Sequence, residues 1–307
     1  MPAQPSRTPT RSAQGVRNVR PLSGRAPTAQ RMIFGETLRK HREALGLKEK
    51  EVAEAIGGCS ASKISRLENG EHDFKEKDVL CLLDVYQVAD PAERERLLAL
   101  SQEANQKGWW EAWRDVAPKE LQTYVSLEDI AARIRSYESG QLLGLLQTAD
   151  YTRALVQANS LEPSGRTADR IIELRAMRAQ RFLEESATQL ICVLDEVTLS
   201  RGYGTNQIMH QQIEHLIDLA EHERISFRLA PSARLNLPVQ IGTTTIFDFT
   251  ADQLPAIVYV ERCNGGLYLQ DRHEVDSYER GFDRLMVNTL GPVACLQKLK
   301  DYSKKYR

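Results

Sequence analysis

The apolar positions between residues 48 and 70 fall into two short helical patterns separated by glycines. The buried face of the first is made of Val52, Ala53 and Ile56. Gly57-Gly58 ends this helix, because glycine readily adopts the left-handed conformation that helix ends need. Ser60 can cap a second helix, in which the large apolar residues Ile64 and Leu67 form one narrow seam.

The other positions of the second helix carry small or hydrogen-bonding side chains, including Ala61, Ser62, Lys63, Ser65 and Arg66. A helix that buries one thin edge leaves its other side free to enter the major groove of DNA, where hydroxyl and guanidinium groups read base edges. The pattern therefore predicts a helix-turn-helix that reads DNA. The alternative is that the two helices form an ordinary part of an all-α core.

Further helical patterns flank this pair. One is predicted from about Met32 to Leu45, another around Val79–Tyr86, and a third after Asp90-Pro91, since proline favours the first turn of a helix. Five helices within residues 32–104 predict one compact all-α domain.

Residues 32–104 resemble the xenobiotic-response-element family of helix-turn-helix domains, the phage-repressor and Cro-like proteins. The matching positions are Leu38-Arg39, Arg42, Gly46-Leu47, Val52-Ala53, Ile56-Gly57 and Ser62-Lys-Ile-Ser-Arg-Leu-Glu-Asn-Gly70. Two features depart from the family pattern. Lys48-Glu49 replaces the usual Ser or Thr followed by Gln, and the turn is one residue longer, which Gly58 is expected to absorb.

The resemblance implies roles for individual residues. Arg42 would pair with Glu68, and Asn69 would reach a phosphate. Lys48 lies at a position where the family usually contacts the DNA backbone, so it would weaken or replace that contact. The positions that would face the bases are Ser60, Ala61, Ser62 and Arg66, with Lys63 and Ser65 beside them.

Residues 1–31 contain six arginines, five prolines and no acidic residue. Such a segment cannot bury enough apolar surface to fold, so a disordered basic tail is predicted. It is either a flexible arm that attracts phosphates or an unselected extension. A secretory signal is not expected, because no apolar core of the necessary length follows the arginines.

The charge of the chain is unevenly distributed. The net charge is −1, and removing the six positive charges of the tail leaves −7 on residues 32–307. Within residues 32–72, seven Lys or Arg residues balance seven Asp or Glu residues, so DNA contacts must come from the placement of charges. We therefore expect modest affinity per monomer and a homodimer that binds paired half-sites on double-stranded DNA.

Five cysteines are widely spaced and form no C-x-x-C motif, which is typical of a reducing cytoplasm and indicates neither a zinc site nor a redox site. No apolar run reaches the roughly 18 to 20 residues of a membrane span. No cofactor is predicted. With 307 residues and 41% hydrophobic content, two domains are expected after the tail.

The second unit, residues 108–307, begins with helical patterns and continues with strands. Helical spacing runs from Leu121 through Ile134 to Tyr137, and a long polar helix is predicted over 164–185. The predicted strands are 190–194, 224–229, 243–249, 257–261 and 267–269, and the later helices are 206–222, 272–290 and one from Pro292. This order predicts an α+β domain, a mixed sheet with covering helices.

This unit resembles the effector domain of actinobacterial helix-turn-helix regulators described as Scr1-family antitoxin-like proteins. The motifs of the match are Gly108-Trp109-Trp110, Ile134-Arg-Ser-Tyr-Glu138, Gly144-Leu-Leu-Gln-Thr-Ala-Asp-Tyr151, Arg175 with Arg178 and Arg181, Leu194-Asp-Glu196, Val258-Tyr-Val-Glu261, and Tyr278 with Phe282-Asp-Arg-Leu285. One departure is Leu142-Leu143 in place of Val-Pro. The resemblance implies a regulator, commonly encoded beside a small acidic partner protein.

Candidate residues for binding a small-molecule effector or a partner are Trp110, Tyr151, Glu196, Tyr259 and Glu261. The carboxylates at the strand ends, Asp195-Glu196 and Glu261, could converge on a crevice of the sheet, but two carboxylates alone are a weak signal, and helix capping and pairing with arginine are the commoner uses. No phosphate loop, nucleophile elbow or zinc-protease motif is present, so an enzyme is not expected. The histidines of 210–222 fit a solvated helix face better than a metal site.

These observations predict a cytoplasmic, homodimeric, DNA-binding transcription regulator whose second domain senses a small molecule or a protein. The competing hypothesis is an antitoxin-like interaction module that sequesters a small partner protein, with DNA binding secondary.

Overall fold

The computed structural model describes residues 28–159, 165–250, 254–262 and 265–307. Most of the predicted basic tail, residues 1–27, therefore lies outside the described residues. The first helix, α1, begins at Ala29, three residues before the expected Met32, with Thr28 as its cap. No described helix is long and apolar enough to cross a membrane.

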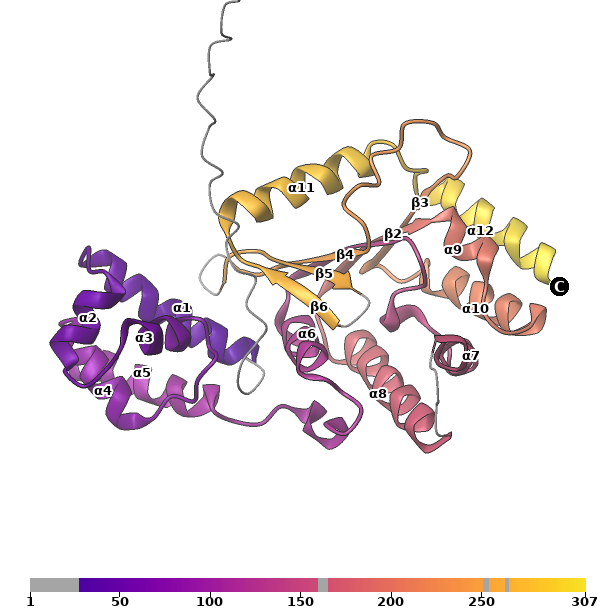
Figure 1. The fold of residues 1–307 in the computed structure, drawn as a ribbon. Helices are drawn as coiled ribbons and strands as arrows, with labels where there is room; N and C mark the ends of the chain where they lie inside the picture. Colours follow the sequence, from indigo (N-terminus) through magenta and orange to yellow (C-terminus); the bar gives the residue numbers. More distant parts are fainter. Residues whose placement is uncertain (1–27, 160–164, 251–253, 263–264) are drawn as a thin grey trace, which may run out of the picture.

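The helical domain at one end of the molecule contains α1 (Ala29–Ala44), α2 (Glu49–Ile56), α3 (Ala61–Glu68), α4 (Glu76–Val85) and α5 (Pro91–Ala104) (Figure 1). Val52, Ile64 and Leu67, the predicted seam residues, are at most 2% exposed and share one core. Phe34 of α1 closes that core edge-to-face against Phe74, with 4.6 Å between ring centroids. The predicted five-helix arrangement is confirmed.

Within the described residues, six strands form one mixed sheet in the order β3-β2-β1-β4-β5-β6. The strands are β1 (Arg133–Glu138), β2 (Gln189–Asp195), β3 (Ile225–Ala230), β4 (Thr244–Asp248), β5 (Ile257–Arg262) and β6 (Gly265–Leu269). β1, β2 and β3 are parallel, whereas β4 runs antiparallel to both β1 and β5. The carboxyl ends of β1, β2, β3 and β5 therefore lie at the same edge.

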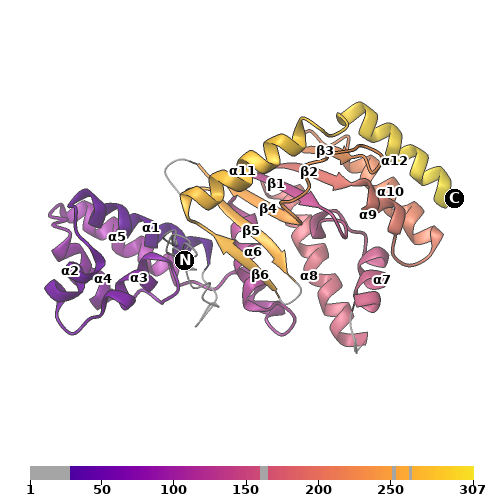
Figure 2. The same ribbon diagram turned by 45° about the horizontal axis from the view of Figure 1, so that its top comes forward.

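Helices cover both faces of the sheet. The remaining elements are the 3-10 turns η1 (Trp109–Trp113) and η2 (Gly144–Leu146) and the helices α6 (Lys119–Ile130), α7 (Ala149–Asn159), α8 (Gly165–Glu184), α9 (Glu196–Arg201), α10 (Asn206–Leu219), α11 (Arg272–Met286) and α12 (Pro292–Tyr306). α11 lies on one face, while α6 and α8 lie on the other (Figures 1 and 2). The predicted α+β class is thus confirmed.

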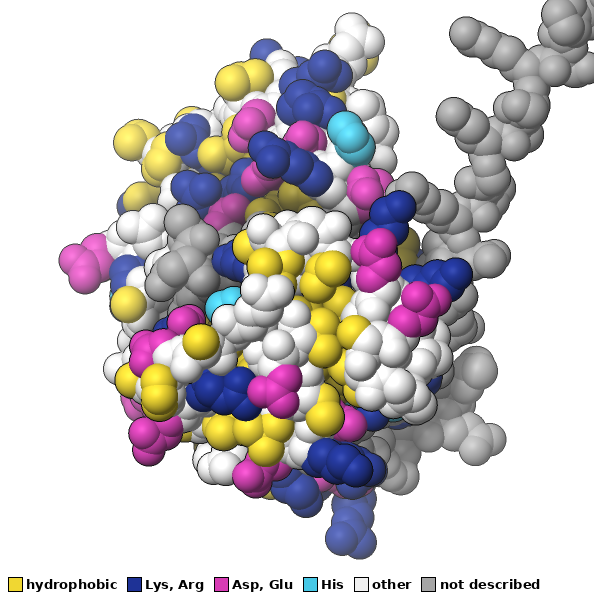
Figure 3. Space-filling view, turned by 90° about the vertical axis from the view of Figure 1, so that its left-hand side faces the viewer, with side chains coloured by type: hydrophobic (Ala, Val, Ile, Leu, Met, Phe, Trp, Pro, Cys, Tyr) yellow, Lys and Arg dark blue, Asp and Glu magenta, His cyan; other side chains and the backbone are white. Residues whose placement is uncertain are grey.

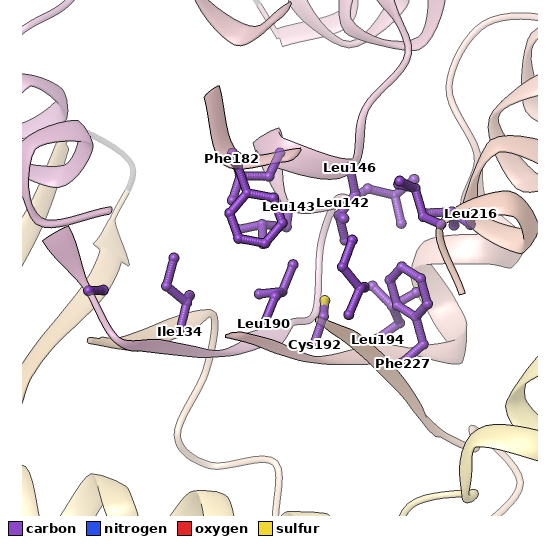
Figure 4. Close-up of a cluster of buried hydrophobic side chains, with 14 of the residues drawn as sticks. Ile134, Leu142, Leu143, Leu146, Phe182, Leu190, Cys192, Leu194, Leu216 and Phe227 are labelled. Atoms are coloured by element: carbon purple, nitrogen blue, oxygen red, sulfur yellow. The ribbon is translucent and has the colours of Figure 1, made fainter. Parts of the chain in front are cut away.

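Alternating side chains of the central strands feed two separate cores. Leu190, Cys192 and Leu194 of β2 point toward η2 and Phe182 of α8 (Figure 4). Val193 points to the opposite side, where it joins the core beneath α11. Because both faces are covered, β2 is an almost continuous apolar run, as parallel strands usually are.

The prediction of a helix continuing to Tyr137 was wrong, because α6 ends at Ile130 and residues 133–138 form the central strand β1. The spacing of Ile134 and Tyr137 in the sequence suits one face of a helix. In the structure they lie in different cores on opposite faces of the sheet. Arg135, 8% exposed, pairs with both Asp248 and Glu279. A strand with so few apolar residues gives a weak local signal, and pairing with both β2 and β4 decides its conformation.

The helical domain contacts the second domain through the start of α1. The backbone N–H of Ala29 donates to Ser126 Oγ of α6 at 2.9 Å, and Ala29 and Met32 join the core of the second domain. Nearby, Arg31 pairs with Asp73 and donates from Nε to the Ala104 carbonyl at 3.3 Å. α1 is therefore shared between the two cores.

Candidate nucleic-acid interface

Helix α3 buries one edge and presents the other. Ile64 is 1% exposed, and Leu67 and Glu68 are each 2% exposed, whereas Ser62 is exposed. Ala61, Lys63, Ser65 and Arg66 are partly exposed between these two extremes. Ser60 caps the helix, since its side chain accepts a hydrogen bond from the Lys63 backbone N–H at 3.2 Å. The residues predicted to face the bases therefore lie on the accessible side of α3.

The turn before α3 uses two consecutive glycines in the left-handed region, with φ of 70° at Gly57 and 69° at Gly58. This conformation is strained for residues with a side chain. The second glycine accommodates the additional residue of the turn, so α3 still packs its apolar edge into the domain core.

An ion pair fixes the end of α3. Arg42 of α1 donates from Nε to Glu68 Oε1 at 2.7 Å and from Nη2 to Oε2 at 2.9 Å, and its Nη1 donates to the Leu47 carbonyl at 2.7 Å. The hydrogen bond with Glu68 raises the pKa of Arg42 above its ordinary value. Burial, reinforced by the charge of Glu68, raises the pKa of the neighbouring Tyr86. This is the pairing that the family resemblance implied.

The residues implied to hold phosphates have protein partners. Asn69 Oδ1 accepts from Arg39 Nη2 at 2.6 Å, so its amide N–H groups are the ones that could donate to a phosphate. Lys48 is exposed at the start of α2, where its backbone N–H donates to Glu51 at 2.6 Å. Arg39 was not among the predicted contacts, although its position one turn before Arg42 on α1 was a signal for it.

Two of the predicted DNA-binding cations are engaged within the domain. Lys63 Nζ lies 2.8 Å from Asp78 Oδ1 of α4, and Arg66 Nε donates to the Ser62 carbonyl at 3.1 Å. Such exposed pairs contribute about 0 to 1 kcal/mol, so DNA phosphates and bases can displace them.

The surface around α3 is mixed in charge. Figure 3, which faces the helical end of the molecule, shows Lys and Arg side chains interspersed with acidic ones. A hollow of about 590 Å³ beside α3 is lined by Ser60, Lys63, Arg66 and also Lys75, a cation that sequence reasoning did not select. Its acidic wall contains Asp73 and Asp78. This surface therefore carries no large area of one charge.

Two of the residues predicted to bind an effector or a partner are buried and not accessible to one. Trp110 is 3% exposed, and a Cβ on Gly108 would lie 2.2 Å from its ring, so glycine is needed beneath it. Tyr151 is 0% exposed inside the hydrophobic core, where its hydroxyl accepts from the Leu142 N–H at 3.4 Å. Packing accounts for both side chains.

Of the two uses considered for the strand-end carboxylates, Glu196 shows pairing with a cation and not convergence with Glu261. Glu196 accepts hydrogen bonds from the Ser232 N–H at 2.8 Å, Lys298 Nζ at 3.1 Å and the Tyr302 hydroxyl at 3.2 Å. Burial acts to raise the pKa of Glu196, but these partners lower it overall. Glu196 follows β2 and Glu261 lies on β5, three strand spacings apart, or about 14 Å across the sheet.

Tyr259 and Glu261 instead line a cavity of about 120 Å³ that also contains Glu138. Glu138 ends β1 and is 3% exposed. Glu138 belongs to one of the motifs of the family resemblance, but it was not among the predicted site residues, because the segment was interpreted as a helix and its position at a strand end was not recognised. Within the described residues, no group of three or more His, Cys, Asp or Glu side chains is arranged to hold a metal ion.

Comparison with known families gives two matches. Residues 33–97 match a helix-turn-helix domain, and residues 121–301 match the family described as Domain of unknown function (DUF5753). The second match covers more than half of the chain. No curated protein and no solved structure was found to match.

Proposed function

Because the chain belongs to the DUF5753 family and carries a helix-turn-helix domain, we propose that it is a sequence-specific, DNA-binding regulator of transcription. The observation that carries the proposal is the burial pattern of α3. Its apolar edge of Ile64 and Leu67 is covered, while the side with Ser62 and Arg66 is accessible. A helix held in this way can lie in the major groove of double-stranded DNA.

The contacts divide into two kinds. Ser60, Ala61, Ser62 and Arg66 would read base edges, with Lys63 and Ser65 at the sides of the groove. Lys48, Asn69 and Arg39 would hold phosphates and set the register. A neutral reading surface supports weak binding by one copy, so we propose a homodimer on two half-sites about 10 base pairs apart.

The second domain is proposed to be a regulatory unit that responds to a small molecule or a protein, and not an enzyme. Helix α6 supports this assignment, because Ser126 bonds to the start of α1 while Tyr124, two residues away, lines the cavity of the second domain. A change in the cavity therefore has a short route to the helical domain. The similarity to actinobacterial Scr1-family regulators of the xenobiotic-response-element type supports the same arrangement.

The competing proposal is an antitoxin-like module that sequesters a small acidic partner protein. The observation in its favour is that Lys63 is paired with Asp78, which reduces the charge offered to DNA. Capture of a stoichiometric small protein from the native cell, with no change in operator binding, would support it.

Genome-wide mapping of bound sites followed by titration with purified protein tests the main proposal. We expect binding to a mapped duplex at least about 1,000-fold tighter than to a scrambled duplex at physiological salt. Light scattering of the complex is expected to show two copies per site. Equal affinity for both duplexes would refute sequence-specific reading.

A further inference from the structure

The cavity of the second domain lies where an α/β sheet most often binds a ligand. It is bounded by Glu138 at the carboxyl end of β1, by residues 243–245 at the start of β4, and by Tyr259 and Glu261 of β5. β1 is the strand at which the direction of the sheet changes, with parallel β2 on one side and antiparallel β4 on the other. The strand order also reverses at β1, because the chain continues to β2 and β3 on one side and then crosses to β4 on the other. Such switch points leave a crevice beyond the carboxyl ends of the strands.

The lining of the cavity includes a buried acid that forms no ion pair with another described residue. Glu138 is 3% exposed, and within the described residues no Lys, Arg or His nitrogen lies within 4.0 Å of its carboxylate. Burial raises the pKa of Glu138 well above its usual range, and the nearby charge of Glu261 raises it further. A positively charged group of a ligand would supply the missing partner.

The lining also includes a cation, Arg175, that forms no ion pair within 4.0 Å in the described part of the chain, although the charge of Glu261 acts on it from farther away. Arg175 of α8 donates to the neutral Gln147 side-chain oxygen, and among the described residues no carboxylate oxygen lies within 4.0 Å of its guanidinium. Its neighbour Arg178 differs, because it makes two hydrogen bonds to Glu128, at 2.9 and 2.8 Å. Burial lowers the pKa of Arg175 to about 10, so it stays charged at neutral pH. It can therefore bind an anionic group.

The volume and the charges of the cavity restrict which ligands fit it. The cavity of about 120 Å³ opens into a wider hollow of about 640 Å³ that shares Arg175 and Glu261 with it and has Leu155, Val156 and Ile171 on its wall. A ligand with only a positive charge would be repelled by Arg175, and a ligand with only a negative charge would be repelled by Glu138 and Glu261 in their ionised forms. A molecule with both charges can pair with both groups, and an apolar substituent can extend into the hollow.

We propose that this cavity binds a small zwitterion of the amino-acid class, with its ammonium group against Glu138 and its carboxylate against Arg175. This assignment deepens the regulatory role proposed for the second domain, but binding itself does not depend on DNA.

Isothermal titration calorimetry of the full-length protein without DNA, at pH 7, tests the assignment. The probes are the twenty standard L-amino acids, with n-butylamine and butyrate as ligands that carry one charge each. We expect at least one amino acid to bind one per chain, and both single-charge probes to bind at least tenfold more weakly. Titrations in phosphate and Tris buffers should also show proton release, since an ammonium group beside Glu138 favours its ionised form.

The variants Glu138→Gln and Arg175→Gln should each weaken binding at least tenfold, and Arg175→Lys should weaken it less. Glu138→Gln has the shape of the neutral acid, so it preserves the packing of the cavity. Arg166→Gln, an exposed change on the same helix, is the matched control and should bind as the parent does.

The assignment is overturned if no amino acid binds at millimolar concentration, if binding survives both cavity variants, or if butylamine or butyrate binds as tightly as the amino acid. A thermal-unfolding midpoint for each variant separates lost binding from lost folding. Operator binding is measured separately, so failure here leaves the DNA-binding proposal standing, and failure of DNA binding leaves this one testable.

Discussion

Replacing Arg42 by Met removes a buried cation from the junction between α1 and α3. Three hydrogen bonds are lost, two to Glu68 at 2.7 and 2.9 Å and one to the Leu47 carbonyl at 2.7 Å. Glu68, 2% exposed, then retains Arg39 Nε at 3.5 Å as its nearest cation. Breaking a buried pair costs about 3 to 5 kcal/mol, and because Arg39 remains we expect about 3 kcal/mol.

Hydrogen exchange of the full-length protein, followed over the peptides of residues 29–104, measures this loss where it occurs. A change of about 3 kcal/mol corresponds to a roughly 150-fold loss of protection for the slowest amides of α1 and α3. Arg96→Met is the control, because Arg96 is an exposed cation of α5 that lies 3.4 Å from Glu93. It should change stability by less than about 0.5 kcal/mol.

A double variant tests the reason for the loss. Replacing Arg42 and Glu68 together by Met removes both charges, so no buried carboxylate is left without its main partner, and most of the stability should return. Unchanged protection in Arg42→Met, or a double variant that is no more stable than the single one, would show that the pair does not fix the end of α3.

Three further outcomes are expected. Arg66→Ala should weaken operator binding about 5- to 150-fold at one base position, corresponding to about 1 to 3 kcal/mol, whereas a uniform loss on all sequences in anisotropy titrations would make Arg66 a phosphate contact. Gly35→Ala should destabilise the helical domain by about 1 to 3 kcal/mol in urea denaturation, because its Cβ would lie 2.4 Å from the Glu68 carbonyl oxygen, and an unaffected midpoint would argue against close packing of α1 on α3. The pKa of Glu138 is raised in the folded protein, so the stability that its protonated form contributes is lost as the pH rises from the unfolded-state pKa of 4.5 through the folded-state pKa. Glu138→Gln should therefore stabilise the protein more at pH 8 than at pH 5 in thermal unfolding. An effect that does not change with pH would contradict this reasoning.

The helical domain could be predicted from the sequence because its signals are local. Ser60 caps a helix, Gly57 and Gly58 permit the turn, and Ile64 and Leu67 lie on one edge of α3 regardless of what else the chain does. The pairing of Arg42 with Glu68 came from family resemblance, since 26 residues separate the two in the chain. The position of these side chains against DNA stays a prediction.

The cavity of the second domain depended on tertiary structure. By spacing, Ile134 and Tyr137 suited a helix, and the pairing of their segment with two neighbouring strands made it β1. The fold buries Glu138, places Arg175 of α8 in the lining of the same cavity, and leaves Glu196 bound to Lys298 elsewhere. Hydrophobic periodicity and capping depend on residues that are close together in the chain, so they can be recognised from the sequence. Which charges are left without partners depends on strand order and helix placement, and those are decided by contacts between segments far apart in the chain.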